Sequence, residues 1–583
     1  MVFRSLAVLA VALPFLLAGS VPPTSTYFNQ AIAFGGCGLW LLARGLTPAG
    51  VAAAPVPVGT RLVSVAGLLL VVSTLTSGAP WGQRLAPLAC LLLAGALMHA
   101  AASAARAGRT DDWIEPLMHA LLLAGVLSVA IGLVQVFLPE RADGLWVAFP
   151  TTPGRAIGNM RQPNQLSTLL LWASAAAVWL GRRERHPPAW LAALLALLVF
   201  GVTLTASRTG TVGVVLLALW GLADRRLPKS IRWTLVAMLP FHALCWAGLD
   251  QWMSTHGMVF YGEDQVRKTL HGDASSSRGR IWADTWTLIR SHPWTGVGVG
   301  AFNFIWSMTP LPQRPVAFFD HSHNLVLQLA VESGVPLAGA VLLLTGVAAW
   351  RSRAGWLAQD EERACSARAV LFMLVLAGVH SMLEYPLWYV YFLLPAAIMA
   401  GWLTGSVPPA ASGPTGATPA REMLRRAAWT LAGVAALAGT AVSTSEYASV
   451  AVIFEPGWSA GEPAPLATRI ERGRRSVLWG HHADYAEVTM APEPEKVFDA
   501  FDRPLHHLAD TRLLMAYARA LAARGELDRA AHVAARLREF RNPMSSEFLA
   551  VCEGRAQARG EVPFQCLPDP GLPAAALRPA AGR

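Results

Sequence analysis

The sequence has little charge. Only 14% of its 583 residues are Asp, Glu, Lys or Arg, whereas soluble globular domains carry about 25%. Apolar residues make up 54% of the chain and gather in long runs. Because runs of about 18 or more apolar residues with few charges are typical of transmembrane helices, an ordinary soluble protein is excluded. The sequence therefore predicts an all-α polytopic membrane protein, long enough to include further domains.

Cysteine is also scarce. The six cysteines form no CxxC pair, so the sequence contains no zinc-binding or redox motif of that kind. Cys552 and Cys566 lie near the C-terminus. In an oxidising periplasm these two thiols would pair as a disulfide, and two free thiols are the equal alternative.

The net charge of +10 does not predict a nucleic-acid partner. Basic residues retained in short cytoplasmic loops of a membrane protein give the same balance. No nucleic acid is therefore expected among the partners of this chain.

The apolar runs predict about thirteen transmembrane helices, several of them short. The first run also resembles a signal peptide, but a retained helix is favoured because so many spans follow it. The runs occupy residues 5–20, 29–43, 61–78, 85–105, 116–138, 164–180, 189–206, 209–223, 232–250, 325–349, 366–382, 386–403 and 427–446.

Arginine-rich connections orient these helices. With the N-terminus inside, the segments "GRRERH" (181–186), "DRRLPKSIR" (224–232), "RSR" (351–353) and "REMLRR" (421–426) fall on one side. Short loops rich in Arg mark the cytoplasm. An odd number of spans then places the C-terminus in the periplasm, which predicts the inner membrane of a Gram-negative cell.

Composition divides the chain into four predicted segments. The C-terminal segment is charged and helix-prone, and its residues 510–540 read as a tetratricopeptide-like hairpin that turns near Gly525. A Pro/Gly/Ser-rich linker at 406–420 is predicted to be flexible. The segments are N-terminal transmembrane helices (1–250), a large periplasmic loop with amphipathic helices (251–322), C-terminal transmembrane helices (323–446) and a periplasmic helical domain (447–583).

The motif "DHSHN" (320–324) stands where the chain turns apolar. Its two histidines favour a general base, since the unperturbed imidazole pKa of about 6.5 lies close to working pH. A metal site would need a third positioned ligand, and a helix cap with Asn324 or Ser322 at the N-cap is the structural alternative. Glu332 lies within the apolar run, where a carboxylate is costly. Because Gly334 and Pro336 break helices, 323–333 is predicted to be a lead-in helix before a span that begins near Val335.

Arginines on the predicted outer face favour an anionic ligand. Arg208 follows a span, and Arg155 and Arg161 lie on the same side. Arg278 and Arg280 open a predicted helix whose Trp282, Trp286 and Ile289 share one face, suited to lying on a membrane. Because Arg binds phosphate oxygens bidentately, these side chains are predicted to clamp a pyrophosphate. The glycines of "TGVGVGAF" (295–302) predict a tight loop, since GxGxxG spacing is missing.

Several segments together resemble one family, the bacterial protein O-oligosaccharyltransferases, which are related to the O-antigen ligases. The resemblance covers about residues 1–540. It rests on "IGNMRQPNQLSTLLL" (157–171), "LTASRTG" (204–210), "SSSRGRIWADTWTLIRSHPWTGVGVGAF" (275–302), "DHSHNLVLQLAVESGVP" (320–336) and "HSMLEYPLWYVYFLLP" (380–395). His323, Asn324 and Gly334 fit the ligase signature, whereas its last position is occupied by Leu337.

The resemblance implies transfer of an oligosaccharide as a block from undecaprenyl pyrophosphate to Ser or Thr of a periplasmic, pilin-like protein. The active site would face the periplasm at the membrane lipid, and no metal or other cofactor is implied. His323 matches the catalytic position, with His321 as a second candidate and Arg208 and Arg280 as catalytic arginines. The implied substrate-binding residues are Arg161, Gln162, Asn164, Arg278, Asn324, Glu384 and Tyr385.

Two other functions stay open at this point. An O-antigen ligase or polymerase would use the same donor with a sugar acceptor, such as the lipid A core. A lipid-linked sugar flippase is a third alternative. Transporters usually place ionisable groups near the bilayer midplane and contain internal repeats, and Glu332 is the one residue here that fits such a pattern.

Overall fold

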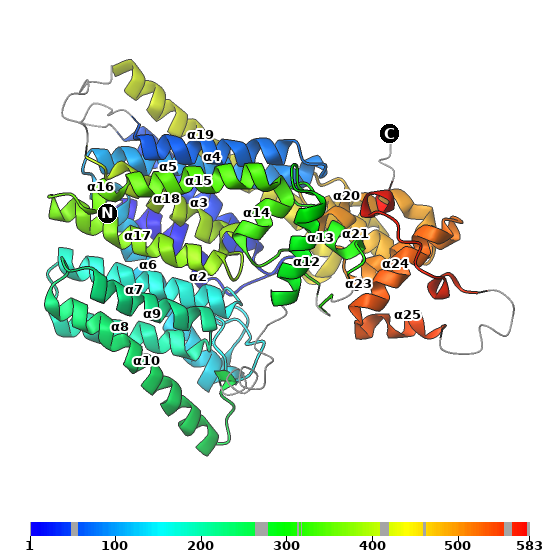
Figure 1. Cartoon of the computed structure of the whole chain (residues 1–583), viewed down its shortest axis with the longest axis horizontal. Helices are drawn as coiled ribbons and strands as arrows, with labels where there is room; N and C mark the ends of the chain where they lie inside the picture. The colour runs from blue at the N-terminus through cyan, green and yellow to red at the C-terminus, as the bar shows by residue number, and fades with distance from the viewer. Residues whose placement is uncertain are drawn as a thin grey trace. The chain divides into compact units, whose positions relative to one another are not determined.

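The computed structural model describes residues 2–47, 56–262, 278–311, 314–315, 318–408, 419–458, 462–552 and 562–579. Within these ranges the chain is helical and has no strand, only an isolated bridge between Val21 and Thr24 (Figure 1). The all-α prediction is confirmed. The predicted linker falls mostly outside the described residues, as do residues 263–277 of the predicted large loop.

The chain divides into two compact units. The first comprises residues 1–68, 89–274 and 342–441, and the second comprises 69–88, 275–341 and 442–583. Four long helices have residues in both units: α4 (Val58–Leu75), α5 (Trp81–Arg106), α15 (Val335–Arg351) and α19 (Pro419–Phe454).

The first unit is a bundle of apolar helices. Its elements are α1 (Val2–Ala7), η1 (Val8–Ala12), α2 (Leu13–Leu16), α3 (Tyr27–Leu46), η2 (Thr110–Asp112), α6 (Ile114–Phe137), η3 (Pro139–Arg141), α7 (Pro163–Arg183), α8 (Pro188–Leu204), α9 (Arg208–Ala223), α10 (Lys229–Thr255), α16 (Arg353–Trp356), α17 (Glu361–Ser381), η4 (Pro386–Trp388) and α18 (Val390–Gly405).

Helix α7 forms the centre of this bundle and packs against α6, α8, α9 and α17 (Figure 1). Every residue from Gln165 to Gly181 is buried, and many are Ala or Ser. Small side chains let helices approach closely, which is how helices associate inside a membrane. At the crossing with α6, a Cβ on Gly125 would stand 2.4 Å from the Cβ of Ala173, so that glycine sets the closest approach.

Six described helices have the length and apolar composition to cross a membrane: α4, α5, α6, the stretch Val335–Trp356, α17 and α19. Four shorter apolar helices accompany them: Val2–Leu16, α8, α9 and α18. Each of the thirteen predicted runs falls on helix, but the exact number of spans stays a prediction.

The second unit has a mixed core of short helices. Its elements are α12 (Arg278–Ser291), α13 (Phe302–Met308), α14 (Leu325–Ser333), η5 (Pro456–Trp458), α20 (Leu466–Arg474), α21 (Gly480–Met490), η6 (Pro494–Phe501), α22 (Asp502–His507), α23 (Thr511–Ala523), α24 (Leu527–Phe540), η7 (Pro543–Ser545), α25 (Ser546–Ala550), η9 (Phe564–Cys566) and η10 (Ala574–Leu577).

The residues predicted to form a hairpin, 510–540, fold as α23 and α24, which pack together around a turn at Gly525 with φ +80° (Figure 1). The Asp510 carboxylate caps α23 by accepting from the Leu513 N–H at 2.8 Å. Cys552 and Cys566 form a disulfide, which settles the alternative that the sequence left open.

The apolar face predicted for α12 is wrong in part. Ile289 is buried in the core of the second unit, and Trp282 is half-buried against it. Only Trp286 is exposed, with 56% of its surface accessible. Most of the amphipathic face therefore packs inside this unit, because its neighbours α13 and α14 offer apolar surface that the local sequence does not reveal.

Candidate functional site

The histidine motif forms a short loop, Asp320–Asn324, here called the histidine loop. Its backbone is held from two sides. The Trp282 indole donates to the Ser322 carbonyl at 3.0 Å, and the Ser322 N–H donates to the Gln328 side chain at 2.8 Å. Asn324 is the N-cap of α14, and its side-chain oxygen accepts from two N–H groups at 3.1 Å. The loop is thereby fixed between α12 and α14.

The predicted break after α14 is confirmed. Helix α14 ends at Ser333, Gly334 adopts φ +81°, and α15 begins at Val335. The glycine loop, Thr295–Gly300, binds this end of α14: the N–H groups of Val297 and Gly298 donate to carbonyls of its last turn at 2.8 and 3.0 Å. The backbone of the glycine loop approaches the backbone of α14 so closely that a side chain would not fit at Gly296. This contact accounts for the glycine-rich segment, and no nucleotide-binding role is needed to explain it.

Two carboxylates flank His321. Asp320 contacts the His321 Nδ1 at 3.1 Å. Burial alone would raise the pKa of Asp320, but the charge of His321 and a hydrogen bond from it lower that pKa to about 2. Glu332 interacts electrostatically with His321 and accepts from the Gly300 N–H at 3.0 Å, yet burial raises the pKa of Glu332 to about 7. The two carboxylates beside His321 therefore differ in environment, and the contact with Asp320 orients the imidazole ring.

We expect the half-buried Glu332 to lower the stability of the protein as pH rises. Its pKa of about 7 in the folded protein lies above the usual 4.5. The stabilisation that protonated Glu332 gives the folded state is therefore fully present below pH 4.5 and is lost as pH rises through 7. Glu332→Gln keeps the acceptor for Gly300. Relative to the wild type, we expect its free energy of unfolding to be higher by up to about 3 kcal/mol at pH 8, and little changed at pH 4.5.

The measurement compares thermal unfolding of the two proteins between pH 4.5 and pH 8. The exposed Glu547→Gln in α25 is the matched control and should follow the wild type at every pH. A constant difference between Glu332→Gln and wild type across the range would contradict the assignment.

His323 has an unusual backbone conformation, with φ +55°. Residues other than glycine seldom adopt this left-handed region, and where they do the strain often marks a functional position. The ring packs edge-on against Phe319, with centroids 5.2 Å apart. This conformation bends the histidine loop at His323, directly before the N-cap Asn324. His321 and His323 therefore lie on opposite sides of Ser322 in segments with different backbone conformations.

Arg278 and Arg280 occupy the first turn of α12, and Arg280 is exposed. Basic side chains at a helix N-terminus are unfavourable for the helix dipole, so this pair does not serve helix stability. Trp282, one turn further along, holds the histidine loop through Ser322. The second unit therefore brings the two arginines and the two histidines onto neighbouring segments.

The first unit contains a second group of predicted residues around Asn164. The Asn164 amide donates to the Glu384 carboxylate at 3.2 Å and accepts from the Ser207 hydroxyl at 2.6 Å. Gln162 is the N-cap of α7, and its side chain accepts from the backbone at Asn164. Asn164 therefore joins the start of α7 to the start of α9 and to the segment before η4.

Arg208 is the first residue of α9 and its side chain is exposed. Arg155 lies close to it: burial and then the charge of Arg208 lower the pKa of Arg155. The Arg155 Nε donates to the Thr205 carbonyl at 2.9 Å, and its guanidinium lies over the Tyr261 ring at 4.5 Å. Two guanidinium groups close enough to affect each other's charge are suited to a phosphate ligand.

Arg161, which the sequence predicts on the outer face, has a different setting from the one expected. Its guanidinium donates to the carbonyls of Ala18 and Ser25 and to the Ser20 hydroxyl. Its φ is +59°. These bonds connect the start of α7 to the segment after α2. Arg161 therefore stabilises the fold, whether or not it also contacts a ligand.

The predicted site residues thus form two local groups. His321, His323, Asn324, Arg278 and Arg280 belong to the second unit, whereas Arg161, Gln162, Asn164, Arg208, Glu384 and Tyr385 belong to the first. Sequence reasoning missed Asp320 and Ser207 as partners of these residues. The position of Asp320 directly before the histidines was a signal for its contact with His321. The position of Ser207 before "RTG" was a signal that it would act as an N-cap.

Three stretches of the chain match models of protein families. Residues 192–340 match the family described as O-antigen ligase, and residues 156–180 match the protein glycosylation ligase family. Residues 368–544 match the C-terminal region of virulence factor membrane-bound polymerases. The first match contains α12, the histidine loop and α14, and the second contains Gln162 and Asn164. The resemblance indicated by the motifs is confirmed.

Two relatives, both from Acinetobacter baylyi, are oligosaccharyltransferases by name. The chain is 26% identical over 274 residues to a general O-oligosaccharyltransferase, a match that covers 44% of each protein. It is 25% identical over 270 residues to a ComP-specific O-oligosaccharyltransferase, covering 43% of this chain and 44% of the relative. The chain thus aligns with less than half of the length of either relative.

Proposed function

We propose that this protein is an O-oligosaccharyltransferase of the bacterial inner membrane. It would transfer an oligosaccharide as a block from undecaprenyl pyrophosphate to a Ser or Thr hydroxyl of a periplasmic, pilin-like protein. The observation that carries the proposal is the match of residues 192–340 to the O-antigen ligases, because that stretch holds the oriented histidines and the basic turn of α12. The relatives' names and the glycosylation ligase match favour a protein acceptor.

The chemistry follows from the two kinds of group. His323, our assigned base, with His321 as the second candidate, accepts the proton of the acceptor hydroxyl as its oxygen attacks C1 of the first sugar. The bond between C1 and the pyrophosphate oxygen breaks in the same displacement, and undecaprenyl pyrophosphate departs. Arg280 and Arg208 would stabilise the charge that develops on that leaving group. Asn164, Glu384 and Tyr385 would bind the donor or acceptor. The active site would face the periplasm.

The decisive experiment is mass spectrometry of a co-expressed pilin-like acceptor. The host should make an undecaprenyl-linked glycan and have no O-antigen ligase of its own. We expect the acceptor to gain the mass of the whole glycan at Ser or Thr only when this gene is present. Glycan found on the lipid A core instead would favour an O-antigen ligase, and longer lipid-linked glycan would favour a polymerase. Movement of the lipid-linked sugar across vesicles without glycoprotein would favour a flippase.

The arginines of α12 make a separate prediction. Arg280→Ala is expected to lower the transfer rate about 10- to 100-fold, because a charge-assisted bond to the leaving group is lost. Arg290→Ala is the matched control, since this exposed arginine belongs to the last turn of the same helix. The rates are measured by intact-protein mass spectrometry at equal enzyme levels. Equal losses in both variants would contradict a specific role for Arg280.

A further inference from the structure

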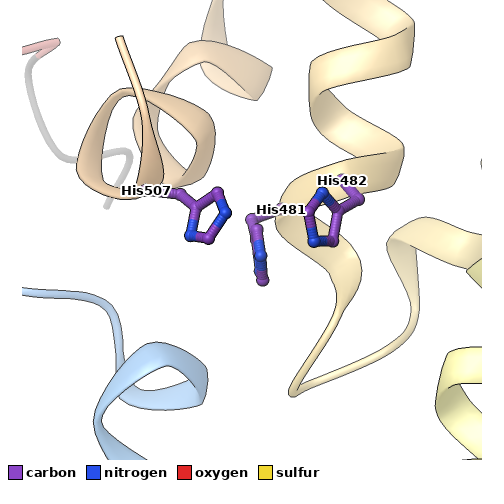
Figure 2. A group of neighbouring side chains, drawn as sticks. All are labelled: His481, His482 and His507. Atoms are coloured by element: carbon purple, nitrogen blue, oxygen red, sulfur yellow. The ribbon is translucent and has the colours of Figure 1, made fainter. Parts of the chain in front are cut away.

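Three histidines outside the proposed site meet in the second unit. His481 and His482 belong to the first turn of α21, and His507 is the last residue of α22. One ring nitrogen from each lies within 4.8 Å of the others. Figure 2 shows the His481 ring between the other two, with ring centroids 4.2 Å from His482 and 4.3 Å from His507. We call these residues the three-histidine cluster.

The cluster contains ring nitrogens that have no hydrogen-bond partner among the described residues. The Nε2 atoms of His481 and His482 are buried and have no hydrogen-bond partner among the described residues. Buried polar atoms are nearly always paired in folded proteins, so two such atoms side by side call for an explanation. Stacking of the His482 ring on Trp479 does not supply one, because ring stacking leaves the nitrogen atoms unsatisfied. A bound cation would satisfy both.

The surroundings of His481 suit a metal ligand. The backbone of Leu478 lies close to this imidazole and favours its cationic form, and the Nε2 atom has no partner among the described residues. Metal-binding histidines usually donate their second ring N–H to a backbone carbonyl or a carboxylate, which fixes the tautomer that binds the ion. His507 is exposed, so solvent reaches the cluster from its side.

Charges around the cluster are partly balanced. Arg503 lies close enough to His481 to disfavour a cation, but it forms an ion pair with Asp484, which also binds Arg474 at 2.8 Å. Asp320 of the histidine loop acts on His507 in the opposite sense. The Asp320 carboxylate therefore interacts with both His507 of the cluster and His321, whose Nδ1 atom it contacts at 3.1 Å.

We propose that His481, His482 and His507 bind one divalent transition-metal ion of the Zn²⁺ class, with the fourth position taken by water. Three imidazoles with an open fourth position are a common Zn²⁺ set, and imidazole also suits Co²⁺, Ni²⁺ and Cu²⁺. The ion links α21 to α22. Through Asp320 it also steadies the histidine loop. Neither statement depends on the proposed transfer reaction.

The test uses the full-length protein in detergent, purified through an affinity tag without histidines and stripped with a chelator. We expect one equivalent of Zn²⁺ per chain in competition with a chromophoric chelator, a four-coordinate absorption spectrum with Co²⁺, and a rise of several degrees in Tm with Zn²⁺. His481→Ala, His482→Ala and His507→Ala should each raise the Kd by more than about a hundredfold, since outer-shell partners alone contribute 10- to 100-fold.

His292→Ala is the matched control, because this exposed histidine lies in the same unit but outside the cluster. It should bind Zn²⁺ like the wild type. Two results would overturn the proposal. One is Zn²⁺ binding by the three cluster variants as tight as that of the wild type. The other is a loss of affinity in His292→Ala as large as in the cluster variants. Should a variant fail to fold, the electron paramagnetic resonance spectrum of the Cu²⁺-loaded wild type decides: coupling to imidazole nitrogens is expected, and its absence overturns the site. Because no readout uses glycan transfer, these results stand apart from the proposed function.

Discussion

His323→Ala and His323→Gly are both expected to lower glycan transfer by at least about a hundredfold, while the Gly variant is the more stable of the two. Loss of a general base typically costs about 10²- to 10⁴-fold in rate. The backbone at this position has φ +55°, which costs a residue with a Cβ on the order of 1 kcal/mol, and glycine adopts it freely. The pair of variants thus separates the role of the imidazole from that of the backbone.

The measurement combines intact-mass analysis of the acceptor with the Tm of each purified variant. We expect His323→Gly to unfold at a temperature a few degrees above that of His323→Ala. His321→Ala completes the series, because Asp320 orients that ring and makes it the alternative base. If His323→Gly kept wild-type transfer and His321→Ala abolished it, the roles that we assign to the two histidines would be exchanged.

Gly334→Ala is expected to destabilise the protein by more than about 3 kcal/mol. Gly334 has φ +81° and ψ +156°, a region that only glycine commonly occupies. An added Cβ would stand 2.2 Å from the Trp294 carbonyl oxygen, and this contact is with backbone, which has little freedom to move. The bond from the Val335 N–H to the Pro293 carbonyl at 2.8 Å would be lost as the segments separate.

Gly339→Ala is the matched control in α15. No atom lies within 4 Å of the position of its Cβ, so alanine there should be neutral or stabilise the helix by up to about 1 kcal/mol. The readouts are the yield of monodisperse protein after solubilisation and its Tm. Equal yields and Tm values for Gly334→Ala and the wild type would contradict the rigid contact between the glycine loop and α14.

Local patterns in the sequence were sufficient for most elements of the fold. The apolar runs predicted helices because a helix of a given length and composition depends mainly on residues close in sequence. The same holds for Asn324 as an N-cap, for the helix break at Gly334 and for the turn at Gly525. Several motifs taken together, among them the spacing of His323, Asn324 and Gly334, indicated the resemblance that the matches of residues 192–340 and 156–180 confirm.

The partners of these residues were decided by tertiary packing. Nothing in the local sequence predicts that Trp282 reaches Ser322, that Asn164 joins Ser207 to Glu384, or that most of the amphipathic face of α12 is buried. Such contacts join segments far apart in the chain, and they form only where the core brings helices together.

The sequence by itself determined a helical membrane protein, and it predicts a histidine and arginine chemistry suited to a pyrophosphate-linked donor. The three-histidine cluster shows what the sequence left undetermined. His481 and His482 are adjacent in the sequence and form no recognisable metal-binding motif, and His507 lies on another helix. Their nitrogen atoms converge only because α21 packs on α22, so the tertiary structure alone created that site. The physical reason is that side-chain chemistry is local, whereas a binding site is an arrangement of groups that distant segments supply.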